Sequence, residues 1–451
     1  MSIPENHTSD LLRKLSQGRL NNLIAQADAR RILQEVKEIP RNYPDFDPLL
    51  TEKVTHIAYA LLSCGCSLIE NADNSVNATE SLAILERAGK LLSDTYKYND
   101  NEVDEKYYNL LIAGMALYAA KQYSRAFIVL KNINLDFNVG QIIIQFIKKD
   151  FNSLLQNVSQ IFFAPPIELP DMQSLDEWAI SHEIARIFLM IIDFVQTGNQ
   201  SNFKIIDDIF NKLLAIATEG NLISYWLIVR LLRIILSTFH EASLWSILPP
   251  LLPSQYITKN YIQLLSGFMP PVTELWPSQA VAIPLAVGEN GGGVINLRTS
   301  GGKTRVAEIA ILSTLSAHTM SKVLYLAPFR SLAFEVEQSL SKVFGPLGIT
   351  VSQLYGGSTA NLTDFELINE SQVIIATPEK AKALIRCGSG LETEIKLIVV
   401  DEGHLLGAEE RYIKNEMFLT HINEFASQNQ IRMLLLLSLI HISEPTRPRL
   451  I

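Results

Sequence analysis

A loop of small residues lies between two apolar stretches in the second half of the chain. The run Val294–Leu297 leads into Ser300-Gly301-Gly302-Lys303-Thr304, and the amphipathic stretch Val306–Leu315 follows. A strand, a glycine loop and a helix in this order form a cradle for phosphates, because glycines let backbone N–H groups approach closely and the helix N-terminus adds its positive end. In such a cradle Lys303 reaches the terminal phosphates of a nucleotide and the Thr304 hydroxyl binds Mg²⁺. The residues expected to contact the nucleotide here are Thr299, Ser300, Gly301, Gly302, Lys303, Thr304 and Arg305.

An acidic pair follows a second apolar run about a hundred residues further on. Ile395–Val400 predicts a buried strand, and Asp401 and Glu402 come directly after it. Ligands of a parallel sheet bind beyond the carboxyl ends of the strands, so the pair and the glycine loop would open onto one crevice. Asp401 can hold Mg²⁺ through water, and Glu402 can polarise an attacking water, as a phosphoryl-transfer site requires. An isolated acidic pair is more often a solvated turn, but its spacing from the glycine loop favours the catalytic interpretation.

Six short apolar runs, separated by helical patterns, surround these two motifs. Alternation of this kind implies a parallel sheet that helices cover on both faces. We therefore expect an α/β domain in which the glycine loop and the acidic pair both follow strands. The expected strands are Val294–Leu297, Val323–Leu326, Thr350–Leu354, Val373–Ala376, Leu397–Val400 and Met433–Leu437.

The two motifs resemble motifs I and II of the superfamily 2 helicases of the DExH-box class. Leu297 stands where the strict phosphate-loop pattern has its first glycine, and that superfamily often lacks it. Three further segments occur in the family's order, and their form is most similar to the Ski2-like branch. Trp276–Gln279 resembles the upstream glutamine motif, Ala327–Ala333 resembles motif Ia, and Ala376–Lys380 resembles motif Ib. The resemblance covers residues 275–438 and implies a P-loop RecA-like domain that binds ATP and Mg²⁺.

The resemblance also implies roles for individual residues. Gln279 would bind the adenine edge and His404 would couple the ATP site to the nucleic-acid site, although a surface glutamine and a structural histidine are the common alternatives. The implied catalytic residues are Lys303, Asp401, Glu402 and His404, and the implied metal ligands are Thr304 and Asp401. Segments that line the nucleic-acid track in relatives supply Arg330, Gly356, Gly357, Thr377 and Lys380. Cations, hydroxyls and backbone N–H groups at helix N-termini suit phosphates without reading base sequence, but each of these residues could equally be a turn or cap residue.

The first 250 residues predict an all-helical domain, because apolar residues recur at helical spacing with few breakers. Residues 107–130 resemble a tetratricopeptide-type helical hairpin. No clean 34-residue period is present, so an irregular helical domain is the simpler interpretation. The expected helices are Leu11–Val36, Val54–Ile69, Ala78–Leu92, Tyr107–Ala120, Tyr123–Leu130, Trp178–Gln196, Phe203–Thr218 and Ile223–His240.

The whole chain therefore predicts an α region followed by an α/β domain. Prolines over 251–272 indicate a linker, and residues 273–438 would form the RecA-like ATP-binding domain. Residues 439–451 resemble translated sequencing-adapter read-through, and we expect them not to be native. On that expectation the chain is a fragment that lacks the second RecA-like domain of such helicases. Weak or absent activity is then expected from the fragment alone.

Composition limits the classes of protein that the chain can belong to. Its net charge of −9 excludes a basic tail that binds polyanions along its whole length, so contacts with nucleic acid must be local. Three cysteines, Cys64, Cys66 and Cys387, predict neither a metal site nor a disulfide framework, which fits a reducing cytoplasm. The polar N-terminus carries no signal-like apolar run, and apolar stretches such as Tyr225–Leu236 contain arginines, so no membrane segment is expected.

Two hypotheses for function follow from these observations. The leading one is an ATP-dependent nucleic-acid helicase or translocase that couples ATP hydrolysis to strand movement. The alternative is a nucleotide switch or scaffold ATPase whose helical region binds a protein partner. Ski2-like helicases with unusual N-terminal regions also occur in anti-phage systems, but no residue here establishes that role. DNA and RNA are not distinguished, because backbone contacts do not read bases and no base-reading element is visible.

Overall fold

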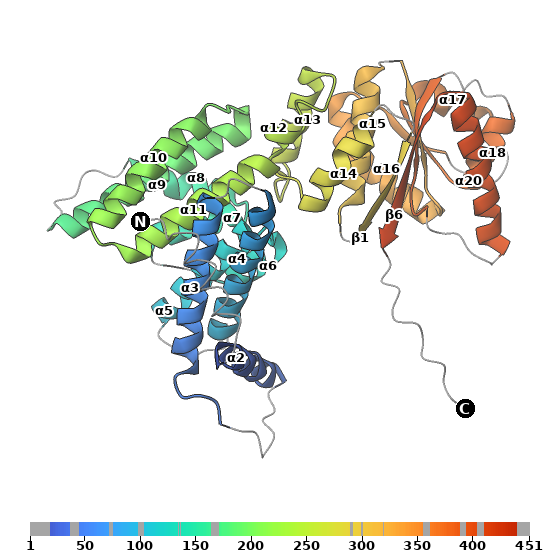
Figure 1. Ribbon diagram of the computed structural model, residues 1–451. Helices are drawn as coiled ribbons and strands as arrows, with labels where there is room; N and C mark the ends of the chain where they lie inside the picture. Colours follow the sequence, from blue (N-terminus) through green and yellow to red (C-terminus); the bar gives the residue numbers. More distant parts are fainter. Residues whose placement is uncertain are drawn as a thin grey trace, which may run out of the picture. The chain divides into compact units, whose positions relative to one another are not determined.

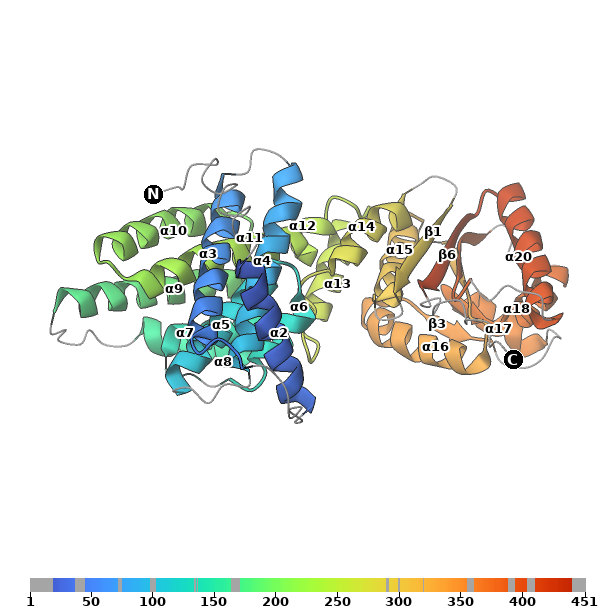
Figure 2. The same cartoon turned by 60° about the horizontal axis from the view of Figure 1, so that its bottom comes forward.

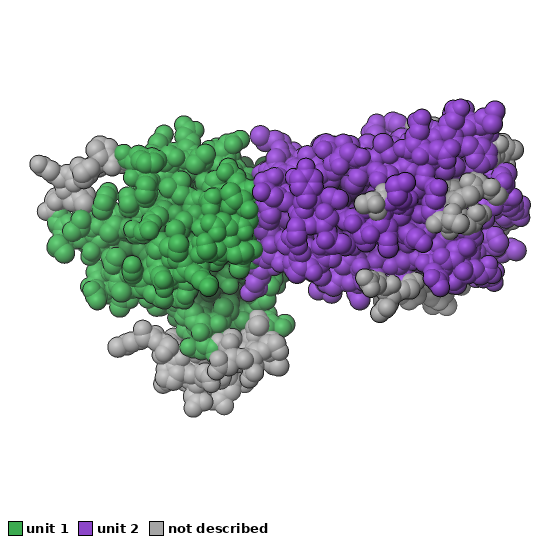
Figure 3. Space-filling view, turned by 90° about the horizontal axis from the view of Figure 1, so that it is seen from above, with its two compact units in different colours: residues 1–240 green, residues 241–451 purple. Residues whose placement is uncertain are grey.

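The computed structural model describes residues 19–36, 45–71, 75–97, 103–133, 135, 137–163, 171–288, 292–298, 301–318, 320–354, 361–387, 394–403 and 410–439. The chain divides into two compact units, residues 1–240 and 241–451 (Figure 3). The first unit is helical, and the second contains a parallel sheet with helices on both faces.

The helical unit confirms the predicted helices wherever the residues are described. The helix expected from Leu11 is described only from Arg19 onward. The predicted hairpin around Lys121-Gln122 is present as α5 and α6. The helices are α2 (Arg19–Val36), α3 (Leu50–Glu70), α4 (Ser75–Tyr96), α5 (Val103–Ala119), α6 (Tyr123–Leu130), α7 (Asn138–Ile147), α8 (Phe151–Phe162), α9 (Met172–Thr197), α10 (Asn202–Glu219) and α11 (Ile223–Ala242).

Two of these helices, α7 and α8, were not predicted. In α7 eight of the ten residues, Val139 to Ile147 apart from Gln141, are buried, although the polar residues Asn138, Gln141 and Gln145 recur at helical spacing and were a usable signal. In α8, Asp150 caps the N-terminus by accepting a hydrogen bond from the Ser153 N–H at 3.2 Å.

Helix α11 is the one helix among the described residues that is long and apolar enough to cross a membrane. Leu231, Ile235 and Phe239 are nevertheless buried inside the helical unit. Arg230, also buried, donates hydrogen bonds to both carboxylate oxygens of Glu70, at 2.8 and 2.6 Å. A buried arginine with a carboxylate partner is compatible with a core helix of a folded domain.

The second unit confirms all six predicted strands. They form one parallel sheet in the order β1-β6-β5-β2-β4-β3. Buried parallel strands are apolar on both sides, which is why the sequence shows them as short continuous runs. The strands are β1 (Gly292–Arg298), β2 (Lys322–Leu326), β3 (Val351–Gln353), β4 (Val373–Ala376), β5 (Ile395–Val400) and β6 (Arg432–Leu439).

Helices cover both faces of this sheet (Figures 1 and 2). One hydrophobic core joins one set of strand side chains, such as Val399 and Leu436, to α13 (Gln255–Ser266), α14 (Pro277–Val287), α15 (Lys303–Ala317) and α16 (Arg330–Phe344). The other core joins their sequence neighbours, such as Val400, to the second set of helices. That set is α17 (Leu362–Glu370), α18 (Pro378–Arg386) and α20 (Glu410–Gln428).

The structure corrects the expected linker over 251–272. The boundary between the two units falls at His240 and not at residue 250. Helix α13 occupies most of the expected linker, and its residues Tyr261, Ile262 and Leu265 are buried in the core beside α15. Prolines on either side of α13 suggested a linker, whereas they flank a packed helix.

Candidate nucleotide-binding and catalytic site

The lysine of the glycine loop and the acidic pair meet at the carboxyl edge of the sheet. The Lys303 ammonium donates a hydrogen bond to Glu402 Oε1 at 2.6 Å and lies 3.9 Å from Asp401 Oδ1. It also donates to the Ser438 hydroxyl, which in turn donates to Glu402 Oε1 at 3.0 Å. Strands β1, β6 and β5 are neighbours in the sheet, so the segments after them lie side by side. The prediction that both motifs open onto one crevice agrees with this geometry.

The second carboxylate oxygen of Asp401 accepts a hydrogen bond from a tyrosine. Tyr325, a fully buried residue of β2, donates its hydroxyl hydrogen to Asp401 Oδ2 at 2.8 Å. Burial raises the pKa of Asp401, while the Tyr325 hydrogen bond and the Lys303 charge favour its ionised form. An aspartate in this position is oriented and partly desolvated, as a ligand for a divalent cation should be.

Glu402 adopts a backbone conformation that is unusual for its residue type. Its φ is +50°, in the left-handed region that costs a non-glycine residue about 1 kcal/mol or more. The Glu402 N–H donates to Asp401 Oδ1 at 2.9 Å, and the Gly403 N–H donates to the Leu436 carbonyl at 3.1 Å. The turn after β5 is thereby tied to both its own aspartate and to β6. This turn directs the Glu402 carboxylate toward Lys303.

Gly302 and Gln279 fix the start of α15. Gly302 has a φ of +71°, and its carbonyl accepts hydrogen bonds from the Arg305 N–H at 3.1 Å and from Gln279 Nε2 at 3.2 Å. Gln279 Oε1 accepts in turn from the Trp276 N–H at 2.9 Å. The side-chain amide of Gln279 therefore links the N-terminus of α14 to the phosphate loop. Its expected contact with adenine remains a prediction, because both ends of the amide bind protein in this arrangement.

Arg305 does not face the expected phosphate site, which corrects its assignment as a nucleotide contact. Its guanidinium donates to Glu308 Oε2 and to the Tyr261 hydroxyl, the latter at 3.3 Å. Tyr261 OH also donates to Glu308 Oε2 at 3.2 Å. Burial raises the pKa of Glu308 and the Arg305 charge opposes that shift. These three side chains join α13 to the first two turns of α15 within the core.

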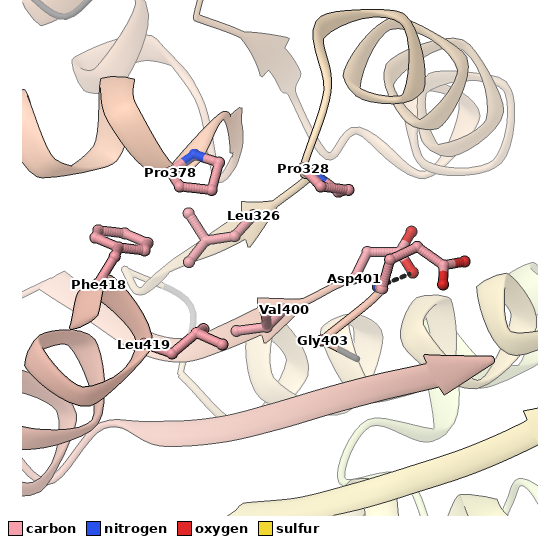
Figure 4. A pocket seen from close by; sticks show the side chains of 9 residues that line it. Leu326, Pro328, Pro378, Val400, Asp401, Gly403, Phe418 and Leu419 are labelled. Carbon is pink, nitrogen blue, oxygen red and sulfur yellow. Dashed lines mark hydrogen bonds between the residues drawn. The ribbon is translucent and has the colours of Figure 1, made fainter. Parts of the chain in front are cut away.

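The segments expected to line a nucleic-acid track come together beside Asp401. A small opening of about 30 Å³ is lined by Pro328 before α16, by Pro378 at the start of α18 and by Phe418 and Leu419 of α20 (Figure 4). Arg330 is exposed at the first position of α16, and Thr377 is half-buried at the N-cap position of α18. Both occupy helix N-termini, as the phosphate-contact interpretation requires.

Lys380 does not belong to this surface, which corrects its expected role as a nucleic-acid contact. Only 1% of its side chain is exposed, and its ammonium donates to Asp364 Oδ2 at 2.6 Å. This buried ion pair joins α18 to α17. An ammonium held in this way cannot reach a phosphate without breaking a buried charge pair, which costs several kcal/mol. The predicted residues Thr299, Ser300, Gly356, Gly357 and His404 lie outside the described residues.

Two residues of the site were not predicted. Ser438 completes the hydrogen bonds around Lys303, and Tyr325 orients Asp401. The serine at the end of the last apolar run was a usable signal, because each functional segment here follows a strand. Tyr325 carried no signal, since a tyrosine within a buried strand is ordinary.

The residues present fit the phosphates of ATP with Mg²⁺. Gly302 provides the left-handed turn before a helix N-terminus, and a Cβ there would lie 2.1 Å from Gln279 Nε2. Thr304 is exposed in the first turn of α15, one residue after the lysine. Lys303 would hold the phosphates, Thr304 and Asp401 would hold the metal ion, and Glu402 would act on water.

The first prediction concerns Gly302. In Gly302→Ala the new Cβ meets the Gln279 amide and the positive φ becomes strained, so the loop must shift. We expect nucleotide affinity to fall at least tenfold, corresponding to about 1.4 kcal/mol or more, by titration with a fluorescent ATP analogue. Gly348→Ala is the matched control, because Gly348 also has positive φ but no atom lies within 4 Å of its Cβ position. Equal losses in both variants would refute a specific role of the Gly302–Gln279 contact.

The second prediction concerns the buried cluster of Tyr261, Arg305 and Glu308. Glu308→Leu leaves the Arg305 cation in the core without its carboxylate, and we expect it to destabilise the second unit by about 3–5 kcal/mol. The double variant Arg305→Met with Glu308→Leu removes both charges and should recover most of that stability. Urea unfolding of the three proteins measures this. A double variant no more stable than Glu308→Leu would contradict the assignment of the pair as a compensated buried charge.

Comparison with known proteins agrees with this geometry. The model of the DEAD/DEAH box helicase family matches residues 276–438. Hachiman protein HamB of Bacillus cereus is 35% identical over 418 residues, which cover 93% of this chain and 37% of that protein. ATP-dependent DNA helicase Hel308 of Thermococcus kodakarensis is 36% identical over 151 residues, which cover 34% of this chain and 13% of that protein.

A solved structure, described as DEAD-box helicase Mss116 bound to ssRNA and UDP-BeF, aligns with a TM-score of 0.37 and 23% identity. The alignment covers 44% of this chain and 40% of that one. The chain spans well under half the length of the two curated relatives named above. The matched segment holds the phosphate loop, the acidic pair and Ser438. Residues 276–438 of this chain are therefore similar to the DEAD/DEAH box helicase domain.

Proposed function

We propose that the chain is part of an ATP-dependent nucleic-acid helicase or translocase. The observation that carries this proposal is the cluster of Lys303, Glu402 and Ser438, which joins the phosphate loop, the acidic pair and the end of β6 by hydrogen bonds. The family match over the same segment supports it. The match to ATP-dependent DNA helicase Hel308 supports a helicase role for the whole protein.

Each side chain of the cluster has a distinct role in the proposed reaction. Bound Mg²⁺ would neutralise charge on the transferred phosphoryl group. Lys303 would exchange its bond to Glu402 for the terminal phosphates, because it is a point charge that can pivot on its long side chain. The Glu402 carboxylate would then be released to orient water and accept its proton. Ser438 is hydrogen-bonded to both Lys303 and Glu402. Its hydrogen bonds at the end of β6 would therefore change when Lys303 leaves Glu402.

Nucleic acid is the proposed partner of the surface near Arg330, Thr377 and the opening beside Asp401. Contacts there would be to the backbone, since exposed cations and helix N-termini bind phosphates of any base sequence. The helical unit is the proposed site for a protein partner. The match to HamB covers 93% of the chain and so includes most of that unit, which indicates that it is a shared part of the larger protein.

The third prediction tests the proposed function in the full-length protein. Lys303→Ala removes the cation that holds the phosphates, and Glu402→Gln removes the carboxylate that accepts a proton. We expect each to reduce strand-stimulated ATP hydrolysis by about 100-fold or more, measured by phosphate release with and without DNA or RNA. Glu402→Gln should retain nucleotide binding, whereas Lys303→Ala should lose it.

The control for this experiment is Lys212→Glu, a change at an exposed residue of the helical unit. Unchanged turnover in both site variants would refute the proposal. If the unmodified protein hydrolyses ATP at the same rate with and without DNA or RNA, and both variants lose this activity, the switch or scaffold ATPase is supported instead.

A further inference from the structure

A second pocket of the α/β unit lies at the amino edge of the sheet, away from Lys303. It has a volume of about 610 Å³ and is lined by three basic side chains, His318, Lys396 and Arg432, which define what we call the basic pocket. Arg432 is the first residue of β6, Lys396 is the second residue of β5, and His318 follows α15. Lys396 and Asp401 lie at opposite ends of β5, about 17 Å apart at 3.3 Å per residue.

The charge of the basic pocket is unusual for this protein. Its described lining residues include three basic side chains and no aspartate or glutamate. The whole chain has a net charge of −9, so the positive charge of this pocket is opposite in sign to the net charge of the chain. Lys396 makes no hydrogen bond or ion pair among the described residues. Like charges that converge on one cavity repel each other, and an anion in the cavity would remove that repulsion.

Arg432 differs from the other buried cations described above. Arg230, Arg305 and Lys380 each bind a carboxylate. Arg432 instead donates to two neutral oxygens, the Gly288 carbonyl at 2.7 Å and Thr314 Oγ1 at 3.1 Å. Burial lowers its pKa, and no acidic neighbour among the described residues opposes that shift. A half-buried guanidinium without a counter-ion gains the most from a bound anion.

The remaining walls indicate what kind of anion fits. Pro250, Leu251, Pro284 and Val287 form an apolar side of the pocket, and the volume far exceeds that of a single phosphate ion. A nucleotide unit offers both features, an anionic phosphate for the cations and an apolar ring for the proline-rich side. A phosphate also offers more acceptor oxygens and more charge than a carboxylate, which suits two converging cations and a histidine ring that can donate a hydrogen bond.

We propose that the basic pocket binds a phosphate group carried by a nucleotide unit, either in the backbone of a nucleic acid or in a free nucleotide. This site is separate from the phosphate loop. It does not depend on the proposed ATP hydrolysis, because its residues come from the opposite edge of the sheet.

The test places a negative charge at Lys396 and His318, because their side chains make no hydrogen bond or ion pair among the described residues. Lys396→Glu and the double variant Lys396→Glu, His318→Glu are made in a Lys303→Ala background, which removes nucleotide binding at the phosphate loop. Arg432 is left intact because it links β6 to α14 and α15. Lys212→Glu in the same background is the matched control, with the same change in net charge as Lys396→Glu. Thermal unfolding verifies that each variant is folded.

Two probes distinguish the sources of the phosphate. One is a fluorescein-labelled twelve-nucleotide oligodeoxythymidylate followed by anisotropy at several salt concentrations, and the other is a fluorescent ATP analogue. We expect Lys396→Glu to weaken oligonucleotide binding about tenfold at low salt and to reduce the magnitude of the salt slope by about 0.7 for each phosphate that the variant no longer neutralises. Loss of binding to the ATP analogue alone would assign the pocket to free nucleotides. If the Lys303→Ala protein binds neither probe, or if the variants bind both as the control does, the proposal is wrong.

Discussion

The hydrogen bonds between the Lys303 ammonium and the side chains of Glu402 and Ser438 are the constraint on which this site depends. They join residues that are 99 and 135 positions apart in the sequence. The sheet places β1, β6 and β5 side by side, all parallel, and so brings their carboxyl ends together at this distance. Two residues in left-handed conformations, Gly302 and Glu402, then direct the side chains toward each other.

Sequence patterns predicted the sheet and the centre of the site because both depend on local signals. Each strand is a short apolar run, and Lys303, Asp401 and Glu402 each follow one. The errors occurred where a side chain finds its partner through the fold. Lys380 was assigned to nucleic acid, but Asp364 on a neighbouring helix binds it. Helix α7 was missed although its polar residues Asn138, Gln141 and Gln145 recur at helical spacing.

Arg305 is an instructive error, because a local signal for its true position was present. Glu308 is three residues further along the same helix, a spacing at which opposite charges pair. The contribution of Tyr261, 44 residues earlier, could not be seen in the same way. Its position in the expected linker also concealed that α13 belongs to the core of the α/β unit.

The basic residues at the two edges of the sheet have different physical explanations. At the carboxyl edge Lys303 follows a helix N-terminus whose positive end already favours anions. At the amino edge, helix C-termini favour cations, which accounts for the bond from Arg432 to the Gly288 carbonyl after α14. That effect does not account for Lys396, which comes from β5 and makes no contact with a helix end among the described residues. Its presence beside Arg432 is explained by an anion that both cations would bind.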